Sequence, residues 1–259
     1  ALTGYGQDGP LAKRAGHDIN YLARAGVLGF QGPANGPPQL PGFQLADIGG
    51  ALWSVVGILA ALADREKTGK GSIVDISMLE SSMGFAAVSY GMMVAGVMPK
   101  AGDEALTGGL AIYGTYGTKD ARAMSLGALE PKFWSAFAAQ IGHEMSMGDF
   151  TVGPHQVELK QKLAKIFSKK TQAEWIAISH EGDFCLEPVL LPNELREDPQ
   201  IAARGIFFDL ATHWGNSQQM RTPVTPRDAQ HRPPPRHGEQ TAEILREAGL
   251  TEEEIAALK

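Results

Sequence analysis

The sequence contains very little cysteine: Cys185 is the only one among 259 residues. A single thiol excludes an internal disulfide framework and a cysteine-rich zinc site, and it fits a reducing compartment such as the cytoplasm. Basic residues are also few, with 23 Lys and Arg against 29 Asp and Glu and a formal net charge of −6. Because proteins that bind a nucleic-acid backbone carry a basic excess, we expect no nucleic-acid partner.

The chain also lacks a long uninterrupted apolar segment. The longest apolar runs follow Asp47-Ile-Gly-Gly and Glu80, and both are shorter than the about 20 residues that a membrane span needs. The first residues, ALTGYGQDGP, resemble a turn and carry no signal-peptide pattern. We therefore expect no membrane span and interpret both runs as buried helices of a globular domain.

The composition is that of a globular protein, with 43% hydrophobic and 20% charged residues. Helical spacing and strand-like runs alternate along the chain, which predicts an α/β fold. Helices are expected over 18–28, from Asp47 to about Gly69, and over 80–98, 131–142, 155–168 and 171–181. Strands are expected over 72–79, 185–191 and 205–210, with a β-hairpin turning at Lys119-Asp120 and two short helical turns around Gly249.

Common catalytic motifs are missing, since the sequence has no P-loop, no HExxH and no GxSxG. Three residues at predicted element ends remain as candidates. His17 precedes a helix whose dipole favours a neutral imidazole, although a simple loop hydrogen bond would equally explain it. Asp47 also precedes a helix and could be only its N-cap. Glu130 could be only a stabilising acid before the helix that starts at Pro131.

Longer strings around these residues narrow the choice. RAGHDINYLARAGVLGF, LADIGGALWSVVGILAALADREKTGKGSIVDISMLE and IYGTYGTKDARAMSLGALEPKFW closely resemble the family III CoA-transferase (CaiB/BaiF-like) superfamily and, within it, the α-methylacyl-CoA racemases. The resemblance extends to the terminal PPPRHGEQTAEILREAGLTEEEIAALK. Gly-His-Asp-Ile-Asn-Tyr is the string typical of racemases, whereas Ala-Asp-Ile-Gly-Gly is shared more widely in the superfamily.

The resemblance implies racemisation at the α-carbon of a 2-methylacyl-CoA thioester. His17, supported by Glu130, would be one acid/base and Asp47 the other. Two bases are needed because the proton leaves one face of the carbon and returns to the opposite face. The resemblance also implies supporting roles for Gly16, Asp18 and Tyr21. It requires no metal and no cofactor, because coenzyme A is part of the substrate.

Removing the α-proton places negative charge on the thioester oxygen, which needs hydrogen-bond donors. The free N–H groups at a helix start are suitable donors, and we expect those of Asp47, Ile48, Gly49 and Gly50 to serve. A methionine-rich surface that holds the acyl chain is a further implication of the resemblance. Its candidates are Met78, Met83, Met92 and Met93, for which gap-filling core packing is the alternative.

For the fold, the resemblance implies an incomplete Rossmann-like large domain, a smaller α/β domain and an interlocked homodimer. The sequence starts at Ala1 without a methionine, so we interpret it as lacking an N-terminal segment that full-length members carry. The expected organisation assigns the catalytic His and Asp to the large domain, followed by a linker, the small domain, and a Pro-rich connector with helices returning to the large domain. These four segments are 1–77, 78–109, 110–222 and 223–259.

Two departures and two alternatives accompany this interpretation. Ala121 stands in the hairpin turn where the family commonly has glycine, and the N-terminal segment supplies many coenzyme A contacts in the family. One alternative is a CoA-transferase in which Asp47 is a nucleophile that forms an acyl anhydride. The other is a non-catalytic truncated chain that associates with a partner through exposed apolar surface.

Overall fold

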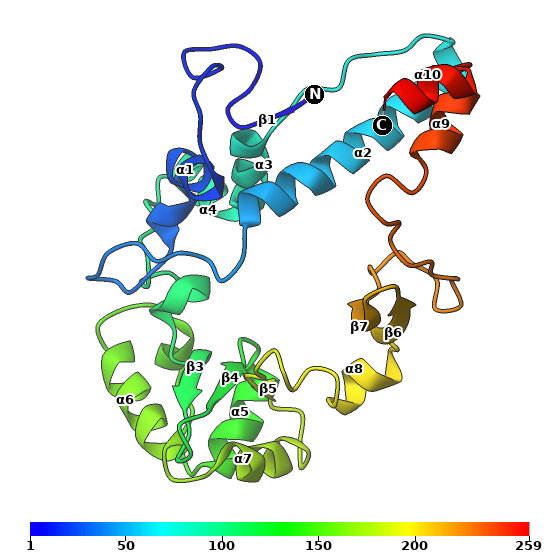
Figure 1. Cartoon of the computed structure of the whole chain (residues 1–259). Coiled ribbons are helices and arrows are strands. Elements are labelled where there is room, and N and C mark those ends of the chain that lie inside the picture. The colour runs from blue at the N-terminus through cyan, green and yellow to red at the C-terminus, as the bar shows by residue number, and fades with distance from the viewer. Residues whose placement is uncertain (259) are drawn as a thin grey trace. The chain divides into compact units, whose positions relative to one another are not determined.

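The computed structural model describes residues 1–258. Internal contacts divide the chain into two compact units, Ala1–Val189 and the segment from Leu190 onward. Both units mix helices with short strands (Figure 1), which confirms the expected α/β class. The first unit contains two separate hydrophobic clusters, one in its N-terminal part and one among residues 110–186.

The N-terminal part of the first unit is mainly helical. Its two short strands pair in parallel, with Leu2 opposite Ile76 and Thr3 opposite Ser77. The helices enclose a small core that includes Tyr21, Leu22 and Ala46. The elements are β1 (Leu2–Thr3), α1 (Asp18–Arg24), α2 (Leu45–Thr68), β2 (Ile76–Ser77), α3 (Met78–Phe85), α4 (Ala87–Val94) and a 3₁₀ helix at Val27–Phe30.

The expected strand over 72–79 is wrong beyond Ile76–Ser77. Ser77 ends the strand and caps α3, because its hydroxyl accepts a hydrogen bond from the Glu80 N–H at 3.1 Å. The capping bond satisfies one of the N–H groups that a helix start leaves free, so the chain turns into a helix at Met78. The single helix expected over 80–98 is likewise two helices, which meet at Ala86.

Helix α2 is not the buried helix that the sequence predicted. Its 24 residues have a most apolar window of mean hydropathy 1.9, and only 17% of that window is buried. Among residues 1–258 it is the one helix that is long and apolar enough to cross a membrane. Length and composition alone do not identify a membrane span, because core helices of globular proteins pass the same test. Exposed apolar side chains continue along it at Leu52, Val55, Val56, Ile58, Leu59 and Leu62.

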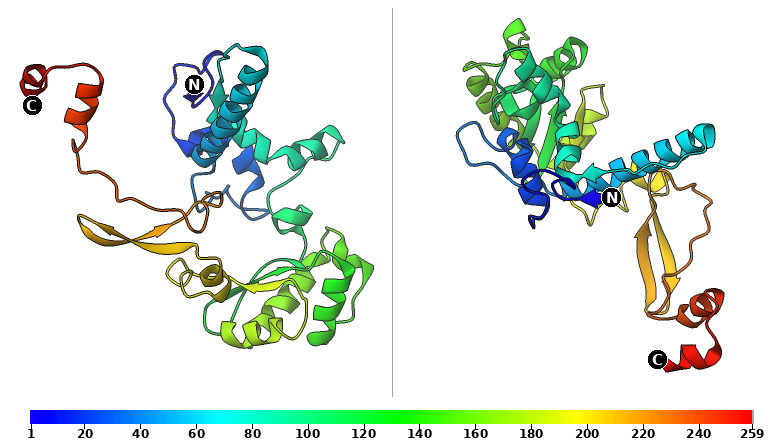
Figure 2. Two further views of the ribbon diagram at one scale, coloured as in Figure 1. Left: turned by 90° about the vertical axis from the view of Figure 1, so that its right-hand side faces the viewer. Right: turned by 90° about the horizontal axis from the view of Figure 1, so that it is seen from above.

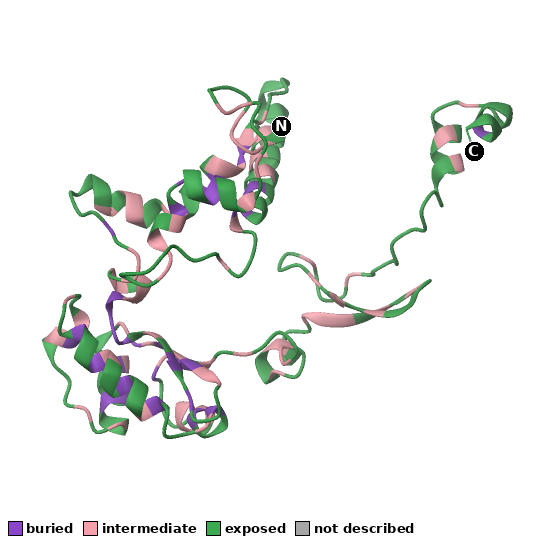
Figure 3. Cartoon of the chain, turned by 60° about the vertical axis from the view of Figure 1, so that its left-hand side comes forward, coloured by how far each residue is buried: buried purple, intermediate pink, exposed green. Residues whose placement is uncertain are grey.

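Residues 110–189 form a layer of helices on an antiparallel sheet of order β3-β4-β5. Figure 3 shows that buried residues gather in these strands and helices. The core is aromatic, with Trp134, Phe137 and Phe167 fully buried. The elements are β3 (Tyr113–Gly117), β4 (Ala123–Gly127), α5 (Pro131–Gln140), α6 (Gln156–Phe167), α7 (Gln172–Ser179), β5 (Leu186–Pro188), a π-helical turn at Ala105–Gly109 and a 3₁₀ helix at Met147–Phe150.

The second unit begins after β5 and holds a long β-hairpin, which Figure 2 displays from two directions. Arg196 forms an exposed bidentate ion pair with Asp209 of the first hairpin strand. The polar second strand, GNSQQM, was not predicted, because it lacks alternating apolar residues. The elements are α8 (Pro199–Ala203), β6 (Phe207–Thr212), β7 (Gly215–Met220), α9 (Thr241–Glu247) and α10 (Glu252–Ala257).

The β3–β4 hairpin turns where the sequence predicted. The Thr118 N–H donates to the Arg122 carbonyl at 2.9 Å, which closes a three-residue loop. Ala121, the last residue of that loop, has φ of 58°. Loops of this length require one residue in the left-handed region, where glycine is favoured because it has no Cβ.

Replacing Ala121 by glycine is expected to raise the free energy of unfolding by roughly 0.5–1 kcal/mol. Left-handed backbone costs a non-glycine residue roughly 1–2 kcal/mol, and the greater freedom of glycine in the unfolded chain offsets part of that gain. Urea unfolding of Ala121→Gly against the unsubstituted chain measures the difference. Ala123→Gly, in the extended strand that follows, should instead destabilise the chain, and equal effects of both changes would contradict the explanation.

Candidate active site

His17 lies directly before α1, and its side chain is exposed. Its backbone N–H donates to the Asn20 side-chain oxygen at 3.0 Å, and its carbonyl accepts from the Asn20 N–H at 2.8 Å. These backbone bonds order the start of the helix, and the imidazole itself is exposed to solvent.

Asp18 joins the starts of two helices that are far apart in the sequence. Its Oδ1 atom accepts hydrogen bonds from the Ala46 N–H at 2.6 Å and from the Asp47 N–H at 3.2 Å. A carboxylate at this position is stabilised by the free N–H groups and the dipole of α2. The bond brings the His17 and Asp47 segments together, although 28 residues separate Asp18 from Ala46 in the chain.

Tyr21 holds the residues before His17 in place through a hydrogen bond and ring packing. Its hydroxyl donates to the Gly16 carbonyl at 2.6 Å, and its ring meets the Tyr5 ring edge-on at a centroid distance of 5.0 Å. Burial, followed by the charges of Tyr5 and Asp47, raises the pKa of Tyr21.

The position of the Tyr21 ring explains why residues 4 and 16 are glycines. A Cβ atom would lie 2.5 Å from the Tyr21 ring at Gly4 and 2.8 Å from it at Gly16. The GYGQDG string at residues 4–9 thus contains Tyr5 and one of the two glycines that Tyr21 packs against. Sequence reasoning missed Gly4 and Tyr5, and the glycines that flank Tyr5 were the available signal.

The expected oxyanion donors already have partners. The Asp47 N–H donates to the Asp18 carboxylate, and the Ile48 N–H donates to the Gln44 carbonyl at 3.0 Å. Gly49 and Gly50 lie inside α2, where each N–H donates to the carbonyl four residues earlier. The structure therefore does not support Ile48, Gly49 and Gly50 as free donors.

The two glycines also have a packing role in the structure. Both are buried, and a Cβ at Gly49 would approach the Phe85 ring to 2.5 Å. At Gly50 it would lie 2.8 Å from the Met78 side chain. The missing side chains therefore allow α2 and α3 to pack closely.

Glu130 lies at the start of α5, and its carboxylate is exposed. Its carbonyl accepts hydrogen bonds from the N–H groups of Phe133 and Trp134, both at 3.1 Å. Within residues 1–258, no hydrogen bond or ion pair joins its side chain to His17 or Asp47. Its support of His17 remains a prediction.

The four methionines lie on α3 and α4 but differ in exposure. Met78 is half-buried and packs against the small N-terminal core, as a gap-filling residue does. Met92 is also half-buried. Met83 and Met93 are each 41% exposed, so these two residues are more accessible to solvent than Met78 and Met92.

No metal site is visible in this part of the chain. Among residues 1–258, no three side chains of His, Cys, Asp or Glu are close enough together to hold a metal ion. The starts of α1 and α2 instead present an exposed imidazole, His17, and an exposed carboxylate, Asp47. Such a pair can take up and release protons.

Comparison with known proteins agrees with the fold and the motifs. The family described as CoA-transferase family III matches residues 1–241. The chain is 36% identical to the mouse protein named alpha-methylacyl-CoA racemase, over 99% of the chain and 68% of that protein. It is 32% identical to a Fusarium pseudograminearum acyl-CoA transferase, over 100% of the chain and 59% of that protein.

A solved structure shares the same fold. The CAIB/BAIF family protein from Brucella suis superposes with a TM-score of 0.74 at 25% identity, over 95% of this chain and 66% of that one. The chain belongs to CoA-transferase family III. It spans about two thirds of the length of the mouse and Brucella relatives.

Removing the Asp18 carboxylate is expected to loosen the site. Asp18→Ala should lower the free energy of unfolding by about 1–2 kcal/mol, because the Ala46 and Asp47 N–H groups lose a charged acceptor. Urea unfolding measures this loss. Asp18→Asn keeps an acceptor oxygen and should lose less, while Asp64→Ala near the other end of α2 should change little; a large loss in the Asp64 control would point to a general effect of charge.

Proposed function

We propose that the chain carries the chemistry of a racemase for 2-methylacyl-CoA thioesters. The observation that supports this most strongly is the Asp18 carboxylate, which holds the His17 and Asp47 segments together at the starts of α1 and α2. Both proposed bases are exposed, so a substrate can reach them. The similarity to the mouse racemase supports the same activity.

The reaction requires two proton transfers at one carbon. One base removes the α-proton, and the electron pair of the broken C–H bond moves into the thioester to form an enolate. The other group, in its acid form, then delivers a proton to the opposite face of the same carbon. His17 and Asp47 supply these two groups, and one turnover exchanges their protonation states, which prepares them for the reverse direction.

The proposed chemistry also bears on the cofactor, the acyl-chain surface and the oligomeric state. We propose that the reaction uses no cofactor, because the thioester itself acidifies the α-proton and coenzyme A belongs to the substrate. Met83 and Met93 offer a flexible apolar surface for the acyl chain. We further propose a homodimer in the cytoplasm, supported by the exposed apolar side chains of α2 and by the single cysteine.

Proton exchange tests the two-base scheme. In D₂O, the chain should exchange the α-proton of a 2-methylacyl-CoA, followed by ¹H NMR. His17→Ala and Asp47→Ala should each slow the exchange by about 10²–10⁴-fold, the usual contribution of a general acid or base. His237→Ala in the Pro-rich connector is the matched control. No exchange by the unsubstituted chain, or exchange insensitive to both changes, would contradict the proposal.

A CoA-transferase is the alternative, which the family and its acyl-CoA transferase member favour. In that reaction the Asp47 carboxylate attacks the thioester carbonyl, coenzyme A leaves as the thiolate, and an acyl anhydride remains on the enzyme. Hydroxylamine traps such an anhydride as a hydroxamate. A hydroxamate that forms with acyl-CoA and disappears in Asp47→Ala would favour the transferase.

A non-catalytic chain that acts by association is the second alternative. The exposed apolar face of α2 favours it, because large exposed apolar patches mark interaction surfaces. Size-exclusion chromatography with light scattering distinguishes the states. A monomer with no affinity for an added N-terminal segment of a family member would argue against this alternative.

A further inference from the structure

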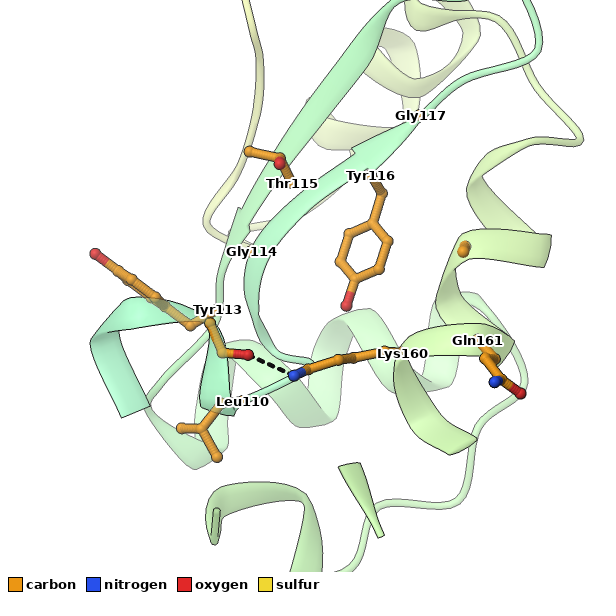
Figure 4. Close-up of a pocket in the computed structure, with 10 residues that line it drawn as sticks. Leu110, Tyr113, Gly114, Thr115, Tyr116, Gly117, Lys160 and Gln161 are labelled. Carbon is orange, nitrogen blue, oxygen red and sulfur yellow. Dashed lines mark hydrogen bonds between the residues drawn. The ribbon is translucent and has the colours of Figure 1, made fainter. Parts of the chain in front are cut away.

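A groove far from the proposed bases in sequence runs along the outer edge of the three-stranded sheet (Figure 4). Its volume is about 460 Å³, and it lies between strand β3 and helix α6. Most of its lining is apolar or backbone. The side chains that the argument uses are those of Tyr116, Lys160, Gln161 and Ala164.

The edge of β3 leaves backbone groups without partners. In the part of the chain that the structure describes, strand β3 pairs with β4 alone. The hydrogen bonds from the Thr118 N–H to the Arg122 carbonyl and from the Ala128 N–H to the Ile112 carbonyl show which residues of β3 bond to β4. Even-numbered residues of β3 bond to β4, so the N–H and carbonyl groups of Thr115 and Gly117 point outward. Within residues 1–258 these four groups have no hydrogen-bond partner.

The open stretch of the edge has defined ends. At one end the Lys119 N–H donates to the Lys170 carbonyl at 2.8 Å, and at the other the Tyr113 N–H donates to the Leu110 carbonyl at 3.3 Å. Between them the free groups follow a strand spacing. Such a row of donors and acceptors matches the backbone of an extended polypeptide.

The groove beside this edge is open because of a glycine. Gly114 lies on the same face of β3 as buried Tyr116, and a Cβ added there would meet nothing within 4 Å. Figure 4 shows the Tyr116 ring pointing toward α6 while Thr115 points the other way. The space over Gly114 can therefore receive a side chain from an added strand.

One charge specifies the ligand further. Among the described residues that line the groove, Lys160 has the one charged side chain, and its ammonium donates to the Gly108 carbonyl across it. A lysine ammonium has three donors, so two remain for another acceptor. A carboxylate is the complementary group for this end of the groove.

We propose that this groove binds an extended segment of a partner polypeptide, which adds a strand to β3 and places a carboxylate at Lys160. The backbone of the segment supplies partners for Thr115 and Gly117. An apolar side chain of the segment occupies the space over Gly114. The surface is an interaction site of this fold and does not depend on the proposed racemase chemistry.

A displayed library of random heptapeptides, selected on the whole chain, provides the probe. Enriched peptides should alternate apolar residues and carry one carboxylate, and they should shift the ¹⁵N amide signals of Thr115 and Gly117. Gly114→Val should weaken the binding of a selected peptide at least ten-fold by filling the groove, and Lys160→Gln several-fold. N-methylation of alternate peptide amides should abolish binding, because it removes the donors that the strand edge needs.

The control is Gly71→Val, where an added side chain also meets nothing within 4 Å but lies outside the groove. It should leave binding unchanged, and circular dichroism should show that both valine variants are folded. Three outcomes overturn the proposal: no enriched peptide, binding that Gly114→Val leaves intact, or self-association of the chain that Gly114→Val removes. The last outcome would assign the edge to a second copy.

Discussion

The capping of α2 by Asp18 is the interaction on which the rest of the candidate site depends. A carboxylate that accepts two N–H groups of a helix start is held by hydrogen bonds and by the helix dipole together. Because Asp18 follows His17 and Asp47 follows Ala46, this one carboxylate fixes the position of both proposed bases. Because Asp18 is engaged in these hydrogen bonds, the proposed acid/base roles fall to His17 and Asp47.

Close packing beneath the site gives the cap its rigidity. Gly4 and Gly16 leave room for the Tyr21 ring, and Tyr21 in turn holds the Gly16 carbonyl through its hydroxyl. On the other side, Gly49 and Gly50 let α3 approach the first turns of α2. These four glycines therefore serve contacts between elements, and the two proposed bases, His17 and Asp47, lie exposed beside those contacts.

Local signals predicted much of this fold. The span of α2 followed from its apolar run and from Gly69, which ends the helix at φ of 69°. The β3–β4 hairpin followed from its turn residues, and α5 to α7 from helical spacing. The strand over 72–79 failed because β-branched residues favoured a strand while the Ser77 cap, a competing local bond, started a helix.

The sequence did not predict the contacts between residues that are far apart in the chain. Nothing in the string Gly-His-Asp-Ile-Asn-Tyr indicates that its aspartate caps a helix 28 residues away. The apolar run of α2 showed which residues avoid water but not which surface covers them, and most remain exposed. Sequence reasoning thus identified the candidate residues, whereas the hydrogen bonds that relate them required the structure.

The same cap changes how the enolate charge would be stabilised. A thioester oxygen at the start of α2 would compete with the Asp18 carboxylate for the Asp47 N–H and would lie beside a like charge, which is unfavourable. Within residues 1–258, one backbone N–H in the first turn of α2 has no hydrogen-bond partner, and it belongs to Leu45. One N–H offers less stabilisation than the four donors expected from the sequence. Within the two-base scheme, the acid that returns the proton must therefore supply more of the charge stabilisation.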